Sequence, residues 1–203
     1  ANKADFFFLQ AKIHKGENQG SHALFILDKT LEGIEHVDTP LFSHTYAHHH
    51  SIYRFNNVKV SKGNIIGKEG DGMSFTHSWF RHERLGIAAR CCGAAERLID
   101  EATNFAKERK SFGQKISNYQ SIQNMLADSV TELAASRLLL YEICKAHDVK
   151  EDVKVLHAKC SMIKLNASEM ANRVADRAVQ IFGGRGYMRE NVAERYYREL
   201  RAD

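Results

Sequence analysis

Proline is nearly absent from this chain, with a single residue, Pro40, among 203. Long apolar runs are missing as well: none approaches the roughly 18 residues that a membrane-spanning helix requires, so no membrane insertion is expected. The N-terminus shows neither a secretory signal nor an Arg-rich transit peptide. The chain enters a buried-strand pattern almost at once, at Phe6 to Leu9, and we therefore expect it to be a piece of a longer protein.

Charge of one sign is not in excess either. Lys and Arg total 29 against 25 Asp and Glu, and the net charge of +4 is dispersed, which argues against nucleic acid as a partner. The cysteines show no CxxC spacing and lie in helical sequence: Cys91, Cys92, Cys144 and Cys160. This usage is typical of reduced intracellular thiols that pack as small apolar groups.

The composition changes abruptly near residue 67, which predicts a domain boundary. Residues 1–66 contain short aromatic and β-branched runs, at Phe6 to Ile13, Ala23 to Leu27 and Ile52 to Val60. Residues 67–203 open on a glycine-rich stretch and then nearly lack glycine and proline over long segments. The predicted fold class is α+β, with a partial β-domain over 1–66 followed by a helical bundle over 67–203, truncated at its end.

Apolar residues recur at spacings of three and four in three long segments, which predicts three antiparallel helices. The segments run from Phe80 to Phe105, from Ile122 to Cys144 and from Ile163 to Ile181. A short last helix is expected over about Val192 to Arg201. The third helix carries a run of small residues that we expect to permit close approach of another subunit: Ala167, Ala171, Ala175 and Ala178.

Two glycine-bearing motifs lie where these helices are expected to end. The first reads Glu-Arg-Lys-Ser-Phe-Gly-Gln over residues 108–114, and Gly113 is expected to close the first helical region. The second reads Gln-Ile-Phe-Gly-Gly-Arg-Gly-Tyr over residues 180–187. Such ends let backbone approach a phosphate closely while a guanidinium contacts its oxygens. Cations opposing the helix dipole are the structural alternative for the first motif, and close helix packing is the alternative for the second.

In this order, the two motifs resemble those of the acyl-CoA dehydrogenase family, and the resemblance runs over the whole chain. It implies FAD as cofactor, bound by residues at the two motifs and just after the first: Arg109, Ser111, Phe112, Gln120, Gln180, Gly183 and Gly184. For Gln120, a polar residue at a helix start is the alternative. The resemblance further implies an acyl-CoA substrate, with Arg84 lining its site.

Glu83 is a candidate catalytic base, because a carboxylate held against apolar surface and flavin is suited to removing a proton alpha to a thioester. In most members of the resembling family the base lies in a motif after the last helix, beyond Asp203, while a minority place it where Glu83 stands. The alternative is that Glu83 is a surface carboxylate that pairs with Arg84 or His82.

Two further clusters suggest binding but have simpler explanations. His44, His48, His49 and His50 have no carboxylate or cysteine to complete a metal shell, so a solvated loop and no metal are expected. The last helix has a cationic stripe interleaved with tyrosines, and nearby glutamates neutralise much of it. The stripe comprises Arg189, Arg195, Arg198 and Arg201, with Glu190, Glu194 and Glu199.

The resemblance implies α,β-dehydrogenation of an acyl-CoA by a homotetramer or homodimer that passes electrons to an electron-transfer flavoprotein. The expected location is the bacterial cytoplasm or, in a eukaryote, the mitochondrial matrix. An acyl-CoA oxidase or a flavin monooxygenase of the same fold remains an alternative, as does a non-catalytic helical assembly module or inactive fragment. Acyl chain length cannot be read from these residues.

Overall fold

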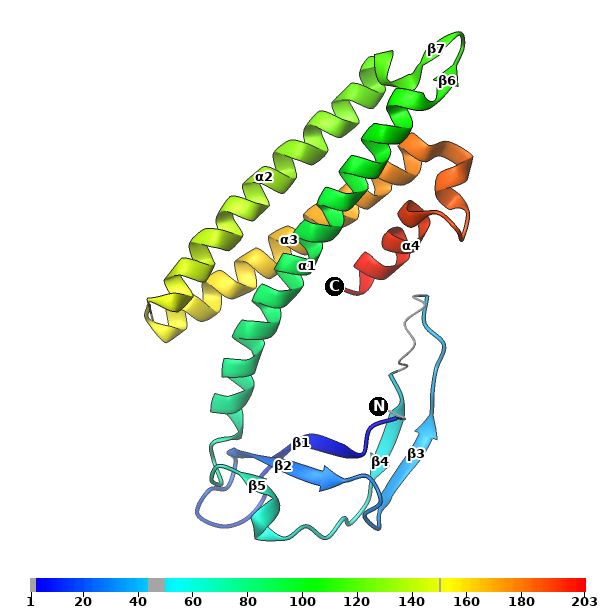
Figure 1. Cartoon of the computed structure of the whole chain (residues 1–203). Helices are drawn as coiled ribbons and strands as arrows, with labels where there is room; N and C mark the ends of the chain where they lie inside the picture. Colours follow the sequence, from blue (N-terminus) through cyan, green and yellow to red (C-terminus); the bar gives the residue numbers. More distant parts are fainter. Residues whose placement is uncertain (1–2, 44–49, 150) are drawn as a thin grey trace. The chain divides into compact units, whose positions relative to one another are not determined.

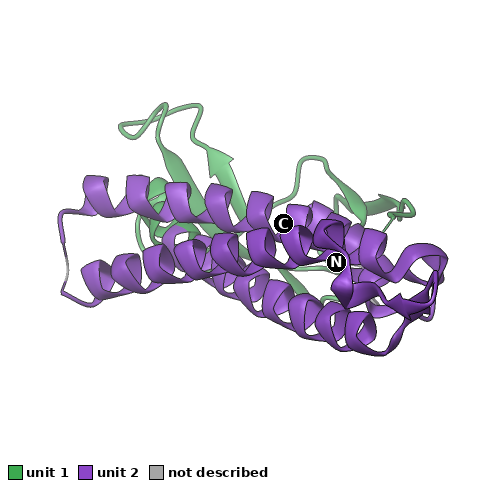
Figure 2. Cartoon of the chain, turned by 90° about the horizontal axis from the view of Figure 1, so that it is seen from above, with its two compact units in different colours: residues 1–80 green, residues 81–203 purple. Residues whose placement is uncertain are grey.

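The computed structural model describes residues 3–43, 50–149 and 151–203. The chain forms two compact units, residues 1–80 and 81–203, shown in different colours in Figure 2. The division falls inside the first long helix, α1 (Gly72–Glu108), whereas the change in composition lies near residue 67.

The first unit contains two small antiparallel sheets, labelled in Figure 1. Strand β2 (His22–Asp28) lies between β1 (Phe6–Lys12) and β5 (Ile65–Ile66), and β1 pairs with β2 from Phe6 opposite Asp28 to Lys12 opposite His22. The second sheet pairs β3 (Ile34–Asp38) with β4 (Ile52–Phe55). The Phe7 ring lies 4.8 Å from that of Tyr53 and 5.8 Å from that of Phe55, so one aromatic residue joins the sheets.

The second unit is a helical bundle made of the remainder of α1, α2 (Gln120–Asp148), α3 (Val153–Phe182) and α4 (Val192–Glu199). In Figure 1 the short connections reverse the chain between successive long helices, as the sequence predicts. Asp152 caps α3 by accepting hydrogen bonds from the backbone N–H groups of Lys154 and Val155 at 3.0 and 3.1 Å. Helix α4 packs against α3 and continues into a 3₁₀ turn, Leu200–Ala202.

The small residues of α3 face the interior of the bundle, which corrects the prediction that they meet another subunit. Ala167, Ala171, Ala175 and Ala178 are all buried within the chain's own core. They lie beside large buried side chains of α1 and α3, among them Leu98, Ile163 and Met170. Small side chains here allow the helices of one chain to approach one another closely.

A short β-hairpin connects α1 to α2, and it changes the expected role of Gly113. Helix α1 ends at Glu108, and β6 (Lys110–Ser111) pairs with β7 (Gln114–Lys115). The two turn residues, Phe112 and Gly113, have φ of 48° and 85°, and positive φ at both positions is what a type I′ hairpin turn requires. Gly113 therefore serves the hairpin turn rather than the end of the helix.

No helix among the described residues has both the length and the apolar character needed to cross a membrane.

Candidate functional site

The two glycine-bearing motifs meet at one end of the bundle and enclose a cavity of about 360 Å³. Three segments supply its walls: the end of α1, the β6–β7 hairpin with the turn after it, and the end of α3. The lining residues are Phe105, Arg109, Ser111, Ile116, Ile181, Phe182, Gly183, Gly184 and Arg185. Motifs about seventy residues apart in the sequence therefore form one site, which we name the bundle-end cavity.

Aromatic packing and hydrogen bonds hold the walls of the bundle-end cavity in place. The rings of Phe105 on α1 and Phe182 on α3 lie 4.7 Å apart, which joins the two helix ends. The Ile116 N–H donates to the carbonyl of Arg109 at 2.9 Å. The Tyr119 hydroxyl donates to the carbonyl of Ser111, also at 2.9 Å, so the hairpin is fixed to the start of α2.

Two arginines of the cavity keep unpaired guanidinium groups. Arg109 and Arg185 are exposed, and neither side chain has a hydrogen bond or an ion pair with any part of the chain that the structure describes. By contrast, the Arg173 guanidinium lies 2.8 Å from a Glu132 carboxylate oxygen. Two free cations beside exposed glycine backbone create a local excess of positive charge suited to a phosphate or diphosphate.

The three glycines of the second motif have three different surroundings. Gly183 ends α3 with φ of 61° and ψ of −140°, a conformation that side chains disfavour. A Cβ at Gly186 would lie 2.6 Å from the Val179 carbonyl oxygen, so close packing on α3 requires glycine there. A Cβ at Gly184 would meet nothing within 4 Å, and its φ is not left-handed. Of these three glycines, only Gly184 has neither a left-handed backbone nor a close internal contact that requires glycine.

The other predicted FAD-binding residues lie outside the lining of this cavity. Phe112 occupies the hairpin turn, with 98% of its surface exposed and a left-handed backbone that is rare for a bulky residue. Gln120 is the first residue of α2 and is exposed. Gln180 is exposed in the last turn of α3, where its carbonyl accepts the Gly183 N–H.

Glu83 lies on α1 as a half-exposed carboxylate that pairs with Arg90. Its Oε1 lies 3.9 Å from Nη1 of Arg90, two turns along the helix, rather than beside Arg84 or His82 as the alternative supposed. The same Arg90 guanidinium contacts the Asp203 carboxylate at 3.2 Å. Arg90 thus links Glu83 to the last turn of the chain.

Arg84 lies where α1 meets α3. Its Nη1 donates to Nε2 of His157 at 2.9 Å, so His157 accepts through that nitrogen. The guanidinium is partly buried.

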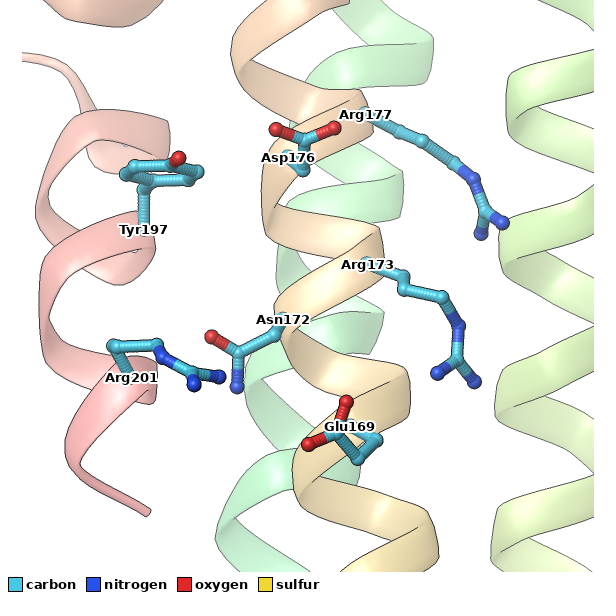
Figure 3. Close-up of a pocket in the computed structure, with 7 residues that line it drawn as sticks. All are labelled: Glu169, Asn172, Arg173, Asp176, Arg177, Tyr197 and Arg201. Atoms are coloured by element: carbon cyan, nitrogen blue, oxygen red, sulfur yellow. The ribbon is translucent and has the colours of Figure 1, made fainter.

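A cavity larger than the bundle-end cavity lies between α3 and α4, and no sequence motif pointed to it. It holds about 580 Å³ and is lined by Glu169, Asn172, Arg173, Asp176, Arg177, Tyr197 and Arg201. Figure 3 shows Tyr197 and Arg201 on the α4 side, with Arg173 and Arg177 directed away from them. Both of these arginines contact Glu132 on α2, at 2.8 and 2.7 Å.

Hydrogen bonds from arginines lower the pKa of two carboxyl groups, one on α2 and one on α4. Partial burial alone would raise the pKa of Glu132, but hydrogen bonds from Arg177 and Arg173 outweigh it and hold that pKa below its usual value. On α4, hydrogen bonds from Arg198 at 2.6 and 2.9 Å lower the pKa of the Glu194 carboxyl. The cationic stripe of the last helix is therefore partly neutralised, as its sequence indicates.

Of the histidine cluster, His44, His48 and His49 lie outside the described residues. Within residues 3–43, 50–149 and 151–203, no three His, Cys, Asp or Glu side chains come together in a way that could hold a metal ion. The cysteines pack as small apolar groups, and burial raises the pKa of the Cys91 thiol to about 12.

Comparison with known proteins gives the family. A profile of the acyl-CoA dehydrogenase C-terminal domain matches residues 70–203. The caffeyl-CoA reductase-Etf complex subunit CarC of Acetobacterium woodii is 41% identical over 145 residues, which are 71% of this chain and 38% of that protein. An acyl-CoA dehydrogenase of Bacillus subtilis is 34% identical over 188 residues, 91% of this chain and 48% of the relative.

Solved structures agree with the sequence relatives. A probable acyl-CoA dehydrogenase from Mycobacterium abscessus superposes with a TM-score of 0.90 at 31% identity, over 98% of this chain and 52% of that one. This chain therefore spans about half or less of the length of the proteins it matches. It belongs to the acyl-CoA dehydrogenase family, of which it represents the C-terminal region.

Proposed function

We propose that the protein containing this chain oxidises the Cα–Cβ bond of an acyl-CoA thioester and that the bundle-end cavity holds the diphosphate region of FAD. The observation that carries this proposal is the convergence of Arg109, Arg185 and Gly184 in one cavity: two unpaired cations beside a glycine with no internal reason to be one. The family's dependence on FAD supplies the identity of the anion.

The residues of the cavity fit a dinucleotide diphosphate. The guanidinium groups of Arg109 and Arg185 would neutralise its charge and donate hydrogen bonds to its oxygens. The Ser111 side chain offers a hydroxyl donor, and the exposed backbone at Gly183 and Gly184 permits close approach. A volume of about 360 Å³ is at the small end of the range for ligand pockets and fits part of a dinucleotide rather than all of it.

Phe112, Gln120 and Gln180 would contact the remainder of the cofactor. All three are exposed in this chain. The left-handed backbone of Phe112 costs of order 1–3 kcal/mol. It holds the ring on the surface, away from the chain's own core, and a bound nucleotide or another subunit could cover the ring there.

The protein's part in the reaction is to bind, orient and deprotonate the substrate. FAD, when bound, accepts the β hydrogen of the substrate as hydride. Arg84, ordered by His157, would face the acyl-CoA. The α proton passes to a carboxylate, which is either Glu83 or a residue beyond Asp203, and the family resemblance favours the latter.

Electrons would leave through an electron-transfer flavoprotein. The similarity to a subunit of a caffeyl-CoA reductase-Etf complex supports this partner. We further propose a homodimer or homotetramer. Apolar side chains on the outer surfaces of α2 and α3 support assembly, because they are exposed in the single chain: Leu138, Tyr141, Met162 and Leu165.

The test uses protein expressed from its whole gene and purified without added flavin. The proposal predicts bound FAD, and anaerobic addition of acyl-CoA should bleach the flavin band and yield a 2-enoyl-CoA detectable by mass spectrometry. Reoxidation by an electron-transfer flavoprotein, with slow reoxidation by oxygen, distinguishes a dehydrogenase from an oxidase. Absence of flavin, or flavin that no acyl-CoA bleaches, would overturn the proposal.

A further inference from the structure

The cavity between α3 and α4, which we name the α3–α4 cavity, is built entirely from the second unit. It holds about 580 Å³, and its lining comes from α3, from α4 and from the 3₁₀ turn that follows α4. Asn172 of α3 holds these walls together, because its Nδ2 donates to the Leu200 carbonyl at 3.0 Å. The shape of the cavity is therefore fixed by the chain itself.

The charged side chains of the lining fall into a paired and an unpaired set. Arg173 and Arg177 contact Glu132 of α2 at 2.8 and 2.7 Å, and Figure 3 shows both directed toward α2. Their charge is thus already neutralised. Three exposed lining side chains form no hydrogen bond or ion pair with any part of the chain that the structure describes: Glu169, Asp176 and Arg201.

The unpaired charges of opposite sign lie on different elements. Glu169 and Asp176 are seven residues apart, which is two turns, so both carboxylates lie on the same face of α3. Arg201 belongs to the 3₁₀ turn after α4, and its side chain is directed toward α3 in Figure 3. The α3–α4 cavity therefore presents a negative row beside a positive charge, next to the half-exposed ring of Tyr197.

This arrangement of charge restricts the partner. The lining contains no aliphatic side chain, whereas small-molecule pockets are lined mainly by apolar ones. A basic segment would be repelled by Arg201, and an acidic segment would be repelled by the two carboxylates. A second copy of this surface, turned about a two-fold axis, presents the charges in the opposite order. It places Arg201 of each copy beside the carboxylates of the other, so both contacts form at once.

The α3–α4 cavity also continues the apolar surface proposed above for assembly. Leu165 is exposed, and Glu169 follows it one turn later on α3. Protein interfaces typically combine an apolar centre with a polar rim, and tyrosine and arginine are enriched in them. One face of α3 would supply part of both the centre and the rim.

We propose that the α3–α4 cavity is the polar part of a two-fold interface with a second copy of this chain, in which Arg201 of each copy pairs with Glu169 and Asp176 of the other. The inference rests on the proposed function only for the statement that the protein assembles. It adds the surface, the symmetry and the charge pairs of that assembly.

The test uses protein expressed from its whole gene and two variants with reversed charge: Arg201→Glu, and Glu169→Lys combined with Asp176→Lys. In a two-fold interface, each variant alone brings like charges together twice, so its self-association should weaken by about a hundredfold or more. An equimolar mixture of the two brings opposite charges together at both contacts. It should reassemble with an affinity within about tenfold of that of the unsubstituted protein. Sedimentation velocity over a concentration series measures these dissociation constants.

Two further variants complete the design, and circular dichroism shows whether each protein is folded. Lys15→Glu makes the same change of charge as Arg201→Glu, at an exposed position between β1 and β2, and it should leave assembly unchanged. Arg201→Gln removes only a guanidinium that has no partner in the described chain. It should therefore fold like the unsubstituted protein and weaken assembly about three- to tenfold. Should a charge-reversed variant fail to fold, the result with Arg201→Gln decides.

Three results would each overturn the inference: charge-reversed variants that assemble like the unsubstituted protein, a mixture that does not reassemble, or an unchanged affinity of Arg201→Gln. The first of these would indicate that another segment of the protein or a different partner covers the cavity. A monomeric protein whose flavin is bleached by acyl-CoA would refute the inference and leave the proposed oxidation intact. Assembly that the mixture restores, without bleaching of flavin, would refute only the proposed oxidation.

Discussion

At the scale of single residues, glycines that look alike in the sequence have separate physical causes. A sequence reader sees an excess of glycine over residues 183–186 and infers a ligand or close packing. The structure assigns a left-handed backbone to Gly183 and close packing to Gly186, and it leaves Gly184 facing open space. Only three-dimensional contacts could separate these causes.

The first prediction contrasts Gly186→Ala with Gly184→Ala. The Cβ added at Gly186 would lie 2.6 Å from the Val179 carbonyl oxygen and 2.9 Å from the Phe182 Cβ, so the backbone must shift. We expect a loss of about 1–3 kcal/mol in the free energy of unfolding. Gly184→Ala should change it by less than about 0.5 kcal/mol. Urea denaturation followed by circular dichroism measures both, and equal stability of the two variants would contradict the packing assignment.

The second prediction concerns the base and uses Glu83→Gln in protein expressed from its whole gene. If Glu83 removes the α proton, the amide cannot replace it, and bleaching of the flavin by acyl-CoA should be abolished with substrate affinity nearly kept. The resemblance favours a base beyond Asp203, so we expect bleaching to persist near the wild-type rate. Stopped-flow spectroscopy measures the rate of flavin bleaching and so distinguishes Glu83 from a base beyond Asp203. A rate loss of ten- to a hundredfold, or about 1.4–2.7 kcal/mol, would indicate electrostatic support of a base located elsewhere.

At the scale of elements, the long helices were predictable and the short elements were not. Spacing of apolar residues at three and four identified α1, α2 and α3, because each helix buries one continuous stripe. Strand β5 and the β6–β7 hairpin are each only two residues per strand, too short for an alternating pattern. Phe112 also obscured the hairpin, because a bulky residue is unexpected in a turn with positive φ.

The third prediction concerns the link between α2 and α3 through Glu132. The pKa of the Glu132 carboxyl lies below the usual 4.5 in the folded chain. The stabilisation of the fold by its contacts with Arg173 and Arg177 is therefore fully present above about pH 4.5, and it is lost as pH falls through the pKa of the folded chain. Glu132→Gln should lower the free energy of unfolding at pH 7 by about 1–3 kcal/mol. The deficit relative to the unsubstituted chain should shrink toward pH 3.

The matched control for that measurement is Glu142→Gln, which removes an exposed carboxylate 4.0 Å from Lys145. Because solvent screens such pairs, its effect should stay below about 0.5 kcal/mol at every pH. Denaturant titrations at a series of pH values give both curves. A deficit of the Glu132 variant that is the same at pH 3 and pH 7 would contradict the ion-pair account.

At the scale of the whole molecule, the sequence predicted that two distant motifs form one site, and the structure brings four of the predicted residues together. Arg109, Ser111, Gly183 and Gly184 line the bundle-end cavity. Arg185 joins them although the sequence argument did not single it out, and its unpaired charge is visible only once its surroundings are known.

The fourth prediction concerns assembly. The alanines of α3 are buried within the chain, so they cannot form the subunit contact. We therefore propose that the exposed apolar residues on the outer surfaces of α2 and α3 form it. The double change Leu138→Glu and Leu165→Glu should convert an oligomer to a monomer, since it places charges in a desolvated interface. Leu41→Glu, at an exposed position in the first unit, is the control. Light scattering on protein expressed from its whole gene measures the mass of the assembly. A double variant with the same assembly mass as the unsubstituted protein would contradict the prediction.

The most direct test of the account is the FAD content of protein expressed from its whole gene and carrying Arg109→Ala or Gly184→Val. Gly93→Val on α1 is the matched control, because a Cβ there also meets nothing within 4 Å and the site is not part of the bundle-end cavity. Absorbance and reversed-phase chromatography of the released flavin give the occupancy, and thermal unfolding shows that each variant is folded. The account predicts at least a tenfold weaker FAD affinity for both cavity variants and an unchanged occupancy for Gly93→Val. Full FAD occupancy in Arg109→Ala and Gly184→Val alike would contradict the central claim that this cavity holds the cofactor.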